Sequence, residues 1–345
     1  MAGVPRQEAR SSAAQAVVGR ATRVEIDLGA LRQNLAVARA AAPRSKIMAA
    51  IKANGYGHGL ERVAKTLHDA DAFGVACINE ALALRMAGIE APITLLEGFF
   101  HTDEIPLLQG YQLEAVLNNA SQVEALERSR FSGTVRVWVK VDTGMHRLGF
   151  APEATRGIWR RLNALKGVEV VGFMTHLACA DDRTHPATPR QLTLFEETTR
   201  GLPGERAIAN SAGVLGWPES HVDWVRPGVM LYGISPLLKG RGSEAKLRPA
   251  MTLHSELIAV NHIPKGGAVG YGATWRAPEA LPVGVIAIGY GDGYPRHAPS
   301  GTPVLLNGKP VPLIGRVSMD MITVDLRRQP HARAGDPTVL WGKGL

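Results

Sequence analysis

Short apolar runs alternate with amphipathic segments between Val24 and Tyr232, and this alternation limits the possible folds more than any other feature. The runs have the length of strands, and the segments between them repeat apolar residues at helical spacing. Strands that alternate with helices form a parallel sheet whose faces are covered by helices. About eight such units in roughly 210 residues predict an α/β fold, a closed (β/α)8 barrel of the TIM type.

Nine strand-like runs are present, one more than such a barrel holds. The run at residues 24–28 is therefore a candidate for a different sheet. The expected strands are residues 24–28, 47–52, 73–78, 93–97, 113–117, 135–141, 168–176, 207–209 and 230–232, and the amphipathic segments include 31–41, 60–70, 80–87 and 152–165.

The composition changes near residues 238–243, where a polar, glycine-rich stretch predicts a linker. Beyond it the helical period disappears, and short apolar runs at 253–260, 283–288, 303–306 and 321–326 are separated by glycine and proline. This pattern is typical of a mostly β domain. The expected organisation is a disordered tail over residues 1–20, a barrel over 21–240 and a smaller β domain over 241–345.

Composition argues against several other classes of protein. Cys77 and Cys179 lie in apolar runs, so we expect two free thiols in a cytoplasmic protein, and no zinc-type spacing predicts a metal site. No apolar run approaches the ~18 residues of a membrane span. The net charge is +8, but the basic residues are scattered apart from a few near the N-terminus. We therefore expect neither a membrane nor a nucleic acid as a partner.

Lys52 ends one of the apolar runs and leads into a glycine-rich turn that carries Tyr56 and His58. A buried ammonium group either gains a partner or loses its charge. At catalytic centres, lysine commonly acts as a neutral amine or bonds a carbonyl compound. The pattern predicts an anchor for a carbonyl cofactor beside a loop that can approach a phosphate.

Other polar residues also stand where expected barrel strands end, which is where barrel enzymes collect their chemistry. A single histidine or arginine at such a place is more often structural. Several of them at the same end of successive strands predict one shared site. They are Lys140 and Arg147, His176, Asn210 with Ser211, and Arg226 with Gly228 and Val229.

Together these residues resemble the alanine racemase family, whose members bind pyridoxal 5′-phosphate (PLP). The resemblance runs from about Val24 to the C-terminus and implies a PLP barrel, a following β domain and a homodimer. The motifs that carry it are the Lys52 segment, Asp142-Thr143-Gly144-Met145 with Arg147, Gly270-Tyr271-Gly272-Ala273-Thr274, Gly289 to Arg296, and Gly315 to Asp320.

The resemblance implies two proton-transferring residues. Lys52 would hold PLP covalently and later act as a base on one face of the substrate. Tyr271 would act on the opposite face and would come from the partner subunit. Racemisation needs this arrangement, because one group removes the α-proton and another returns a proton from the other side.

The resemblance also implies the residues that surround cofactor and substrate. Arg226 would face the pyridine nitrogen, and His176 would pack on the ring. Lys140 can be carbamylated in this family, and its new charge would hold Arg147. The cofactor-binding set is Lys52, Tyr56, Arg147, His176, Asn210, Ser211, Arg226, Gly228 and Val229; the substrate-binding set is Arg147, Tyr290, Met319 and Asp320.

Alternatives stay open at this point. The family has a further segment beyond the position of Leu345, which supplies another phosphate-binding tyrosine, so we expect the β domain to be incomplete at its C-terminus. A related barrel-type PLP decarboxylase and a catalytically weak PLP-binding protein are the competing functions. A racemase could supply D-alanine for peptidoglycan or degrade alanine, with alanine preferred over serine to an unknown degree.

Overall fold

The computed structural model describes residues 19–240 and 242–345, in two compact units. One unit is Ile26–Met251, and the other combines the residues up to Glu25 with Thr252–Leu345. The chain therefore divides later than the predicted boundary at 240, since residues 242–251 belong to the first unit. The predicted tail falls mostly outside the described residues.

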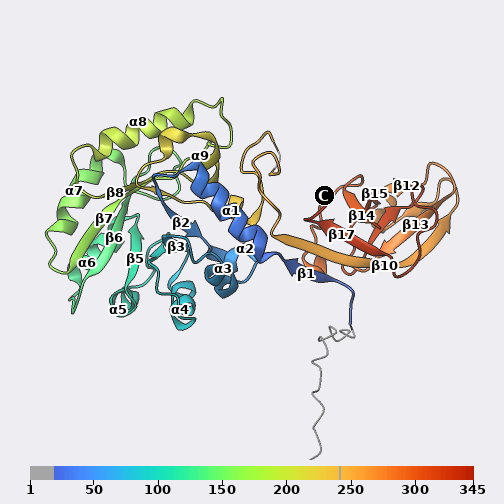
Figure 1. The fold of residues 1–345 in the computed structure, drawn as a ribbon, viewed down its shortest axis with the longest axis horizontal. Helices are drawn as coiled ribbons and strands as arrows, with labels where there is room; N and C mark the ends of the chain where they lie inside the picture. Colours follow the sequence, from blue (N-terminus) through green and yellow to red (C-terminus); the bar gives the residue numbers. More distant parts are fainter. Residues whose placement is uncertain (1–18, 241) are drawn as a thin grey trace, which may run out of the picture. The chain divides into compact units, whose positions relative to one another are not determined.

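The first unit is an eight-stranded closed barrel whose neighbouring strands are parallel, as predicted (Figure 1). Its interior is filled by side chains that include Met48, Val116, Trp138 and Trp224. The indole N–H of Trp138 donates to the buried carboxylate of Glu114, so the interior polar group is satisfied. The strands are β2 (Lys46–Ala50), β3 (Ala72–Val75), β4 (Ile93–Leu95), β5 (Leu113–Leu117), β6 (Val135–Lys140), β7 (Val168–Met174), β8 (Glu205–Ala207) and β9 (Trp224–Val225).

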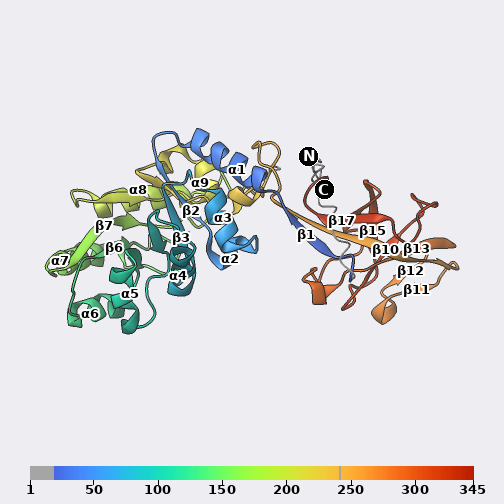
Figure 2. The same cartoon turned by 60° about the horizontal axis from the view of Figure 1, so that its bottom comes forward.

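Helices surround the barrel on its outside, as Figures 1 and 2 show. Helix α1 illustrates why they form: the Asp27 side chain caps its first turn, and Leu31, Leu35 and Ala38 form its buried stripe. The helices are α1 (Leu28–Ala41), α3 (Leu60–Thr66), α4 (Ile78–Met86), α5 (Ile105–Gly110), α6 (Ala120–Arg128), α7 (Pro152–Asn163), α8 (Ala187–Thr199) and α9 (Ser211–Gly216).

Two of the nine expected strands do not belong to the barrel. The run at 24–28 forms β1 (Arg23–Ile26), which lies beside β10 in the sheet of the other unit. This agrees with the expectation that this run, one more than the barrel holds, belongs to a different sheet. The run at 230–232 was wrongly expected to be a strand, because it forms the 3-10 turn η3 (Val229–Tyr232). Residues 230–232 are buried, which accounts for the apolar run. A short apolar run does not by itself distinguish a helical turn from a strand. The barrel closes instead through β9, which has only two residues.

The second unit is mostly β, as predicted, and is built on a seven-stranded sheet. Strand β17 pairs with both β14 and β10, so this edge of the sheet is covered. Strands β15 and β17 were not predicted, because Pro310, Pro312 and Pro337 weaken the strand pattern. The strands are β10 (Met251–Ile263), β11 (Ala268–Val269), β12 (Trp275–Arg276), β13 (Leu281–Ile286), β14 (Pro303–Leu306), β15 (Lys309–Ile314), β16 (Ile322–Asp325) and β17 (Pro337–Trp341).

Gly172 allows strands β7 and β8 to approach each other closely. A Cβ atom at this position would lie 2.0 Å from the carbonyl oxygen of Glu205. We expect Gly172→Ala to destabilise the protein by about 3 kcal/mol or more, because two strand backbones must separate. Gly157→Ala is the matched control in α7, where a Cβ meets nothing within 4 Å and should stabilise the helix by up to about 1 kcal/mol. Denaturant unfolding measures both, and similar midpoints for the two variants would contradict the expectation.

Candidate active site

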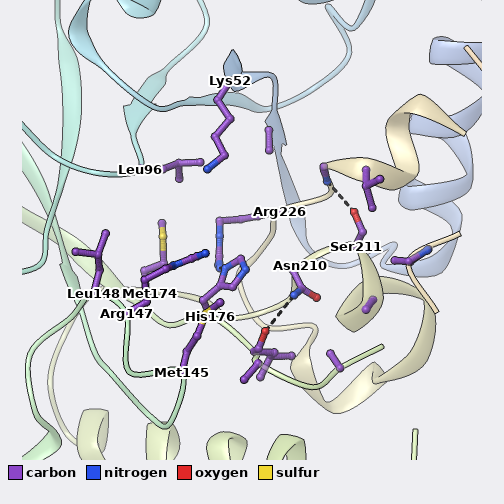
Figure 3. Close-up of a pocket in the computed structure, with 18 of the residues that line it drawn as sticks. Lys52, Leu96, Met145, Arg147, Leu148, Met174, His176, Asn210, Ser211 and Arg226 are labelled. Atoms are coloured by element: carbon purple, nitrogen blue, oxygen red, sulfur yellow. Dashed lines mark hydrogen bonds between the residues drawn. The ribbon is translucent and has the colours of Figure 1, made fainter. Parts of the chain in front are cut away.

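The predicted strand-end residues of the barrel line one cavity of about 720 Å³. Figure 3 shows Lys52, Arg147, His176 and Arg226 projecting into the same space from different strand ends. The cavity is also lined by Tyr56, Lys140, Asn210, Ser211, Gly228 and Val229. The structure thus brings together all the barrel residues of the predicted catalytic and cofactor-binding sets.

Lys52 follows β2 after one intervening residue, Ile51, and opens a short turn, α2 (Lys52–Tyr56), that is left-handed. Ala53, Asn54 and Gly55 have φ between 53° and 61°, and Tyr56 has φ 52°. This conformation costs non-glycine residues roughly 1–2 kcal/mol each. Strain of this kind persists where the surroundings impose it, most often at functional sites.

The surroundings hold this turn through its middle residue. The Asn54 N–H donates to the Glu80 carboxylate, and the Asn54 side chain accepts from the N–H of Leu60. The turn therefore fixes Lys52 at the cavity and presents Tyr56, whose ring stacks on Tyr232 at a centroid distance of 4.6 Å. Burial raises the pKa of Tyr56, so its hydroxyl remains a hydrogen-bond donor.

A cradle of hydroxyl and amide groups lines the cavity next to Tyr56. The Ser211 hydroxyl accepts from the N–H groups of Gly228 at 2.8 Å and Met230 at 3.2 Å. A Cβ atom at Gly228 would lie 2.6 Å from the Tyr56 hydroxyl, so only glycine leaves the space open. Asn210 caps α9 and donates to the carbonyl of Leu177, which fixes the start of this helix.

Arg226 is buried at the floor of the cavity and carries one free donor. Its Nη2 donates to the carbonyl of Thr175 at 2.6 Å, whereas Nη1 has no partner among the described residues. Nη2 also lies 3.4 Å from Nδ1 of His176. Burial, followed by the charge of Arg226, lowers the pKa of His176 to about 3. The imidazole is thus neutral at physiological pH, and its Nδ1 accepts from Arg226.

Lys140 ends β6 and is buried among like charges. Burial lowers its pKa to about 8, and the charges of Arg226, Arg147 and Lys52 contribute to the shift. About a tenth of this amine is therefore uncharged at pH 7, and the uncharged fraction grows as the pH rises through about 8. A neutral amine is a nucleophile, which an ammonium group is not.

Two residues of the site were not predicted from the sequence. Glu97 lines the cavity with its carboxylate 3.7 Å from the Lys52 amine. It ended an expected strand just as Lys52 did, so the same signal could have identified it. Gln191 of α8 is buried, and its amide donates to Thr143 and to the carbonyl of His176. A single polar residue on a helix gives no signal for this role.

The remaining predicted site residues belong to the second unit. Tyr271 starts the turn η4 (Tyr271–Ala273) and is 72% exposed. Tyr290 and Met319 lie on two loops that pack together, since the N–H of Tyr290 donates to Ser318 and the N–H of Gly291 to Met319. Asp320 follows Met319. The second unit therefore holds the exposed Tyr271 and a two-loop cluster with Tyr290, Met319 and Asp320.

The charge of the cavity suits an anionic ligand with an acceptor atom. Lys52, Lys140, Arg147 and Arg226 outnumber the two carboxylates that line it. The free Nη1 of Arg226 requires an acceptor, because an unpaired buried donor is costly. An amine, a cradle of hydroxyl and amide groups and a free arginine donor match the aldehyde, phosphate and ring nitrogen of PLP.

Comparison with known proteins agrees with this geometry. The family model for the N-terminal domain of alanine racemase matches residues 26–236, and that for its C-terminal domain matches residues 250–345. The chain belongs to the alanine racemase family. The family is PLP-dependent, which matches the fit of the barrel cavity. The resemblance in the sequence is thereby confirmed over both domains.

Individual members of the family are similar over nearly their whole length. Alanine racemase from Halorhodospira halophila is 55% identical over 327 residues, which span 94% of this chain and 90% of that protein. Alanine racemase from Nitrosococcus oceani is 54% identical over 322 residues, or 93% and 90%. The crystal structure of biosynthetic alanine racemase from Pseudomonas aeruginosa has a TM-score of 0.92 at 46% identity and covers 95% of this chain and 92% of that one.

Among the described residues, no helix is both long and apolar enough to cross a membrane. Cys77 and Cys179 are free thiols, as expected.

Proposed function

We propose that this chain is an alanine racemase that interconverts L-alanine and D-alanine with PLP bound in the barrel cavity. The observation that carries the proposal is the convergence of Lys52, the free donor of Arg226 and the Ser211 cradle in one cavity. The family to which the chain belongs supports the same reaction.

The cofactor would be held at both of its ends. Lys52 is its covalent anchor, and the left-handed turn fixes the direction from which the amine approaches. Tyr56, Asn210 and Ser211, with the backbone of Gly228 and Val229, form the phosphate site, where small hydroxyls and amides suit an oxyanion. Arg147 and His176 complete the cofactor-binding set.

Bound PLP supplies an electron sink that makes the α-proton of the amino acid acidic. The Lys52 amine removes or returns that proton on one face of the substrate, and the Tyr271 phenol removes or returns it on the opposite face. Arg226 directs a permanently charged donor at the ring nitrogen, so it does not promote protonation there. The neutral His176 beside it adds no charge that would disturb this balance.

The substrate carboxylate would be bound by Arg147 and by the N–H of Met319, with Asp320 beside it and Tyr290 at the entrance. Tyr271 and the two-loop cluster come from the partner subunit of a homodimer. The high exposure of Tyr271 supports this, because an aromatic catalytic group that is open in one subunit is available to another. We place the enzyme in the cytoplasm, where it would supply D-alanine for peptidoglycan or degrade alanine.

Polarimetry tests the reaction directly. Purified protein with added PLP is given L-alanine, L-serine or L-lysine, and the optical rotation is followed to its end point. We expect rotation to decay to zero with L-alanine. Release of CO₂ from L-lysine without racemisation would instead establish the decarboxylase alternative.

Lys140 should react with CO₂, because its lowered pKa leaves the amine neutral as the pH rises through about 8. We expect a carbamate signal by carbon NMR in labelled bicarbonate that is strong at about pH 9 and weak at about pH 6. The product is a carboxylate able to hold Arg147. Lys140→Ala should abolish the signal, and Lys166→Ala, at an exposed lysine, should retain it. A signal of equal strength at both pH values would contradict the assignment.

A further inference from the structure

Two loops of the second unit hold each other closely. The first, residues 289–294, carries Tyr290, and the second, residues 317–321, carries Met319. A Cβ atom at Gly289 would lie 2.3 Å from the carbonyl oxygen of Met319. The Met319 N–H has no acceptor in the described part of the chain. The Met319 N–H is thus an unpaired donor, among the described residues, on a closely packed pair of loops.

Arg20, which precedes the barrel by sequence, joins both loops. One guanidinium nitrogen donates to the Asp292 carboxylate at 2.8 Å and to the carbonyl of Asp320 at 2.7 Å. The other lies 3.3 Å from the Asp320 carboxylate. Asp292 in turn accepts from the N–H of Gly289. A single side chain therefore connects three acceptors on the two loops.

The charges at this position favour a role in binding over one in stability. Without Arg20, the carboxylates of Asp292 and Asp320 would lose this cation on the two loops that carry Tyr290 and Met319, where they would repel an anionic substrate. Arg20 and Asp320 are largely exposed, with side-chain exposures of 43% and 59%. Exposed ion pairs contribute little to folding. Arg20 therefore acts mainly by changing the net charge of the two loops and by holding them in position.

We propose that Arg20 is a positioning residue of the substrate site: it fixes the loop that carries the Met319 N–H and neutralises the carboxylates of Asp292 and Asp320, so that the carboxylate of the amino acid can bind. This rests on the proposed function, which gives Met319 its substrate. Sequence alone placed Arg20 in a tail, and the structure connects it with the loops of the second unit.

The test compares Arg20→Gln and Arg20→Lys with two controls from the same segment. Arg23→Gln removes a neighbouring exposed charge, and Thr22→Val removes the hydrogen bond to Ala287 while Arg20 stays in place. We expect Arg20→Gln to raise the KM for L-alanine about fivefold, with kcat, PLP affinity and Tm near wild type. Arg20→Lys should show a smaller rise in KM, because lysine keeps the positive charge. Some rise should remain, because one ammonium group does not span the three acceptors. Both controls should match wild type.

Hydrogen exchange gives a readout that does not depend on racemisation. In Arg20→Gln, the amides of residues 289–294 and 317–321 should exchange faster, while strands β13 and β16 keep their wild-type rates. Wild-type exchange in both loops, an unchanged KM, or an equal rise in KM for Arg23→Gln would overturn the role of Arg20. Absence of racemisation in the wild type would refute the proposed function instead, and exchange would still decide whether Arg20 fixes the loops.

Discussion

Replacing Lys52 by alanine is expected to leave a colourless protein whose racemase rate falls by at least about 10³-fold. The amine is proposed as both the anchor of the cofactor and one of the two bases, so a single change would remove both roles. The cavity around it should persist, because the turn is held by Asn54 and Glu80 rather than by Lys52. Absorbance after dialysis against PLP-free buffer measures the first effect, and polarimetry measures the second.

Lys65→Ala is the matched control for that variant. Lys65 lies on α3, with an exposed side chain that pairs with Glu61 on the same helix. It should retain both the colour and the rate of the wild type. A Lys52→Ala protein that keeps its visible absorbance through dialysis would refute the anchor assignment.

Tyr271→Phe is expected to lower the racemisation rate by about 10²–10⁴-fold, the usual contribution of a positioned acid or base. The loss should depend on direction, because Tyr271 is proposed to serve one face only. In heavy water, α-deuterium uptake should be suppressed mainly from one enantiomer of alanine. Equal suppression from both would contradict a role on one face, and Tyr111→Phe, at an exposed tyrosine of the barrel unit, should leave both rates unchanged.

Mixing the two variants tests whether Tyr271 comes from the partner. A dimer of one Lys52→Ala and one Tyr271→Phe subunit contains one site with both wild-type residues, provided that the tyrosine crosses between subunits. With random exchange of subunits, about a quarter of the wild-type activity should return. If Tyr271 acted within its own subunit, no activity would return.

The sequence was enough to find most of the polar residues that line the cavity, because they share one simple property. Lys52, Lys140 and His176 are polar residues that directly end or follow apolar strands, and parallel strands bring their ends to one edge. Glu97 obeyed the same rule and was overlooked. Arg20 and Gln191 could not be found in this way, because their partners are distant in sequence and meet them only after folding.

The fold was predictable where patterns were long and failed where they were short. Strand β9 has two residues, which are too few to show any periodicity. The pattern therefore predicts a strand at the apolar run 230–232, which forms a 3-10 turn instead. The left-handed conformation of the turn after Lys52 was also unforeseen, since Asn54 and Gly55 tolerate positive φ but Ala53 and Tyr56 carry no sign of it. Its geometry is imposed by Glu80 and Leu60 from outside the turn, and local sequence does not contain that information.

The pairing of β1 with β10 has a consequence for how the chain is made. Strand β1 leaves the ribosome early, but its partner appears only after the entire barrel has been synthesised. Domains generally fold as units during synthesis, so the barrel can complete its folding before β1 has a partner strand. In gene order the barrel is an insertion within the β domain. A fragment that begins at Thr252 would consequently lack both a strand and Arg20 of the domain it was meant to represent.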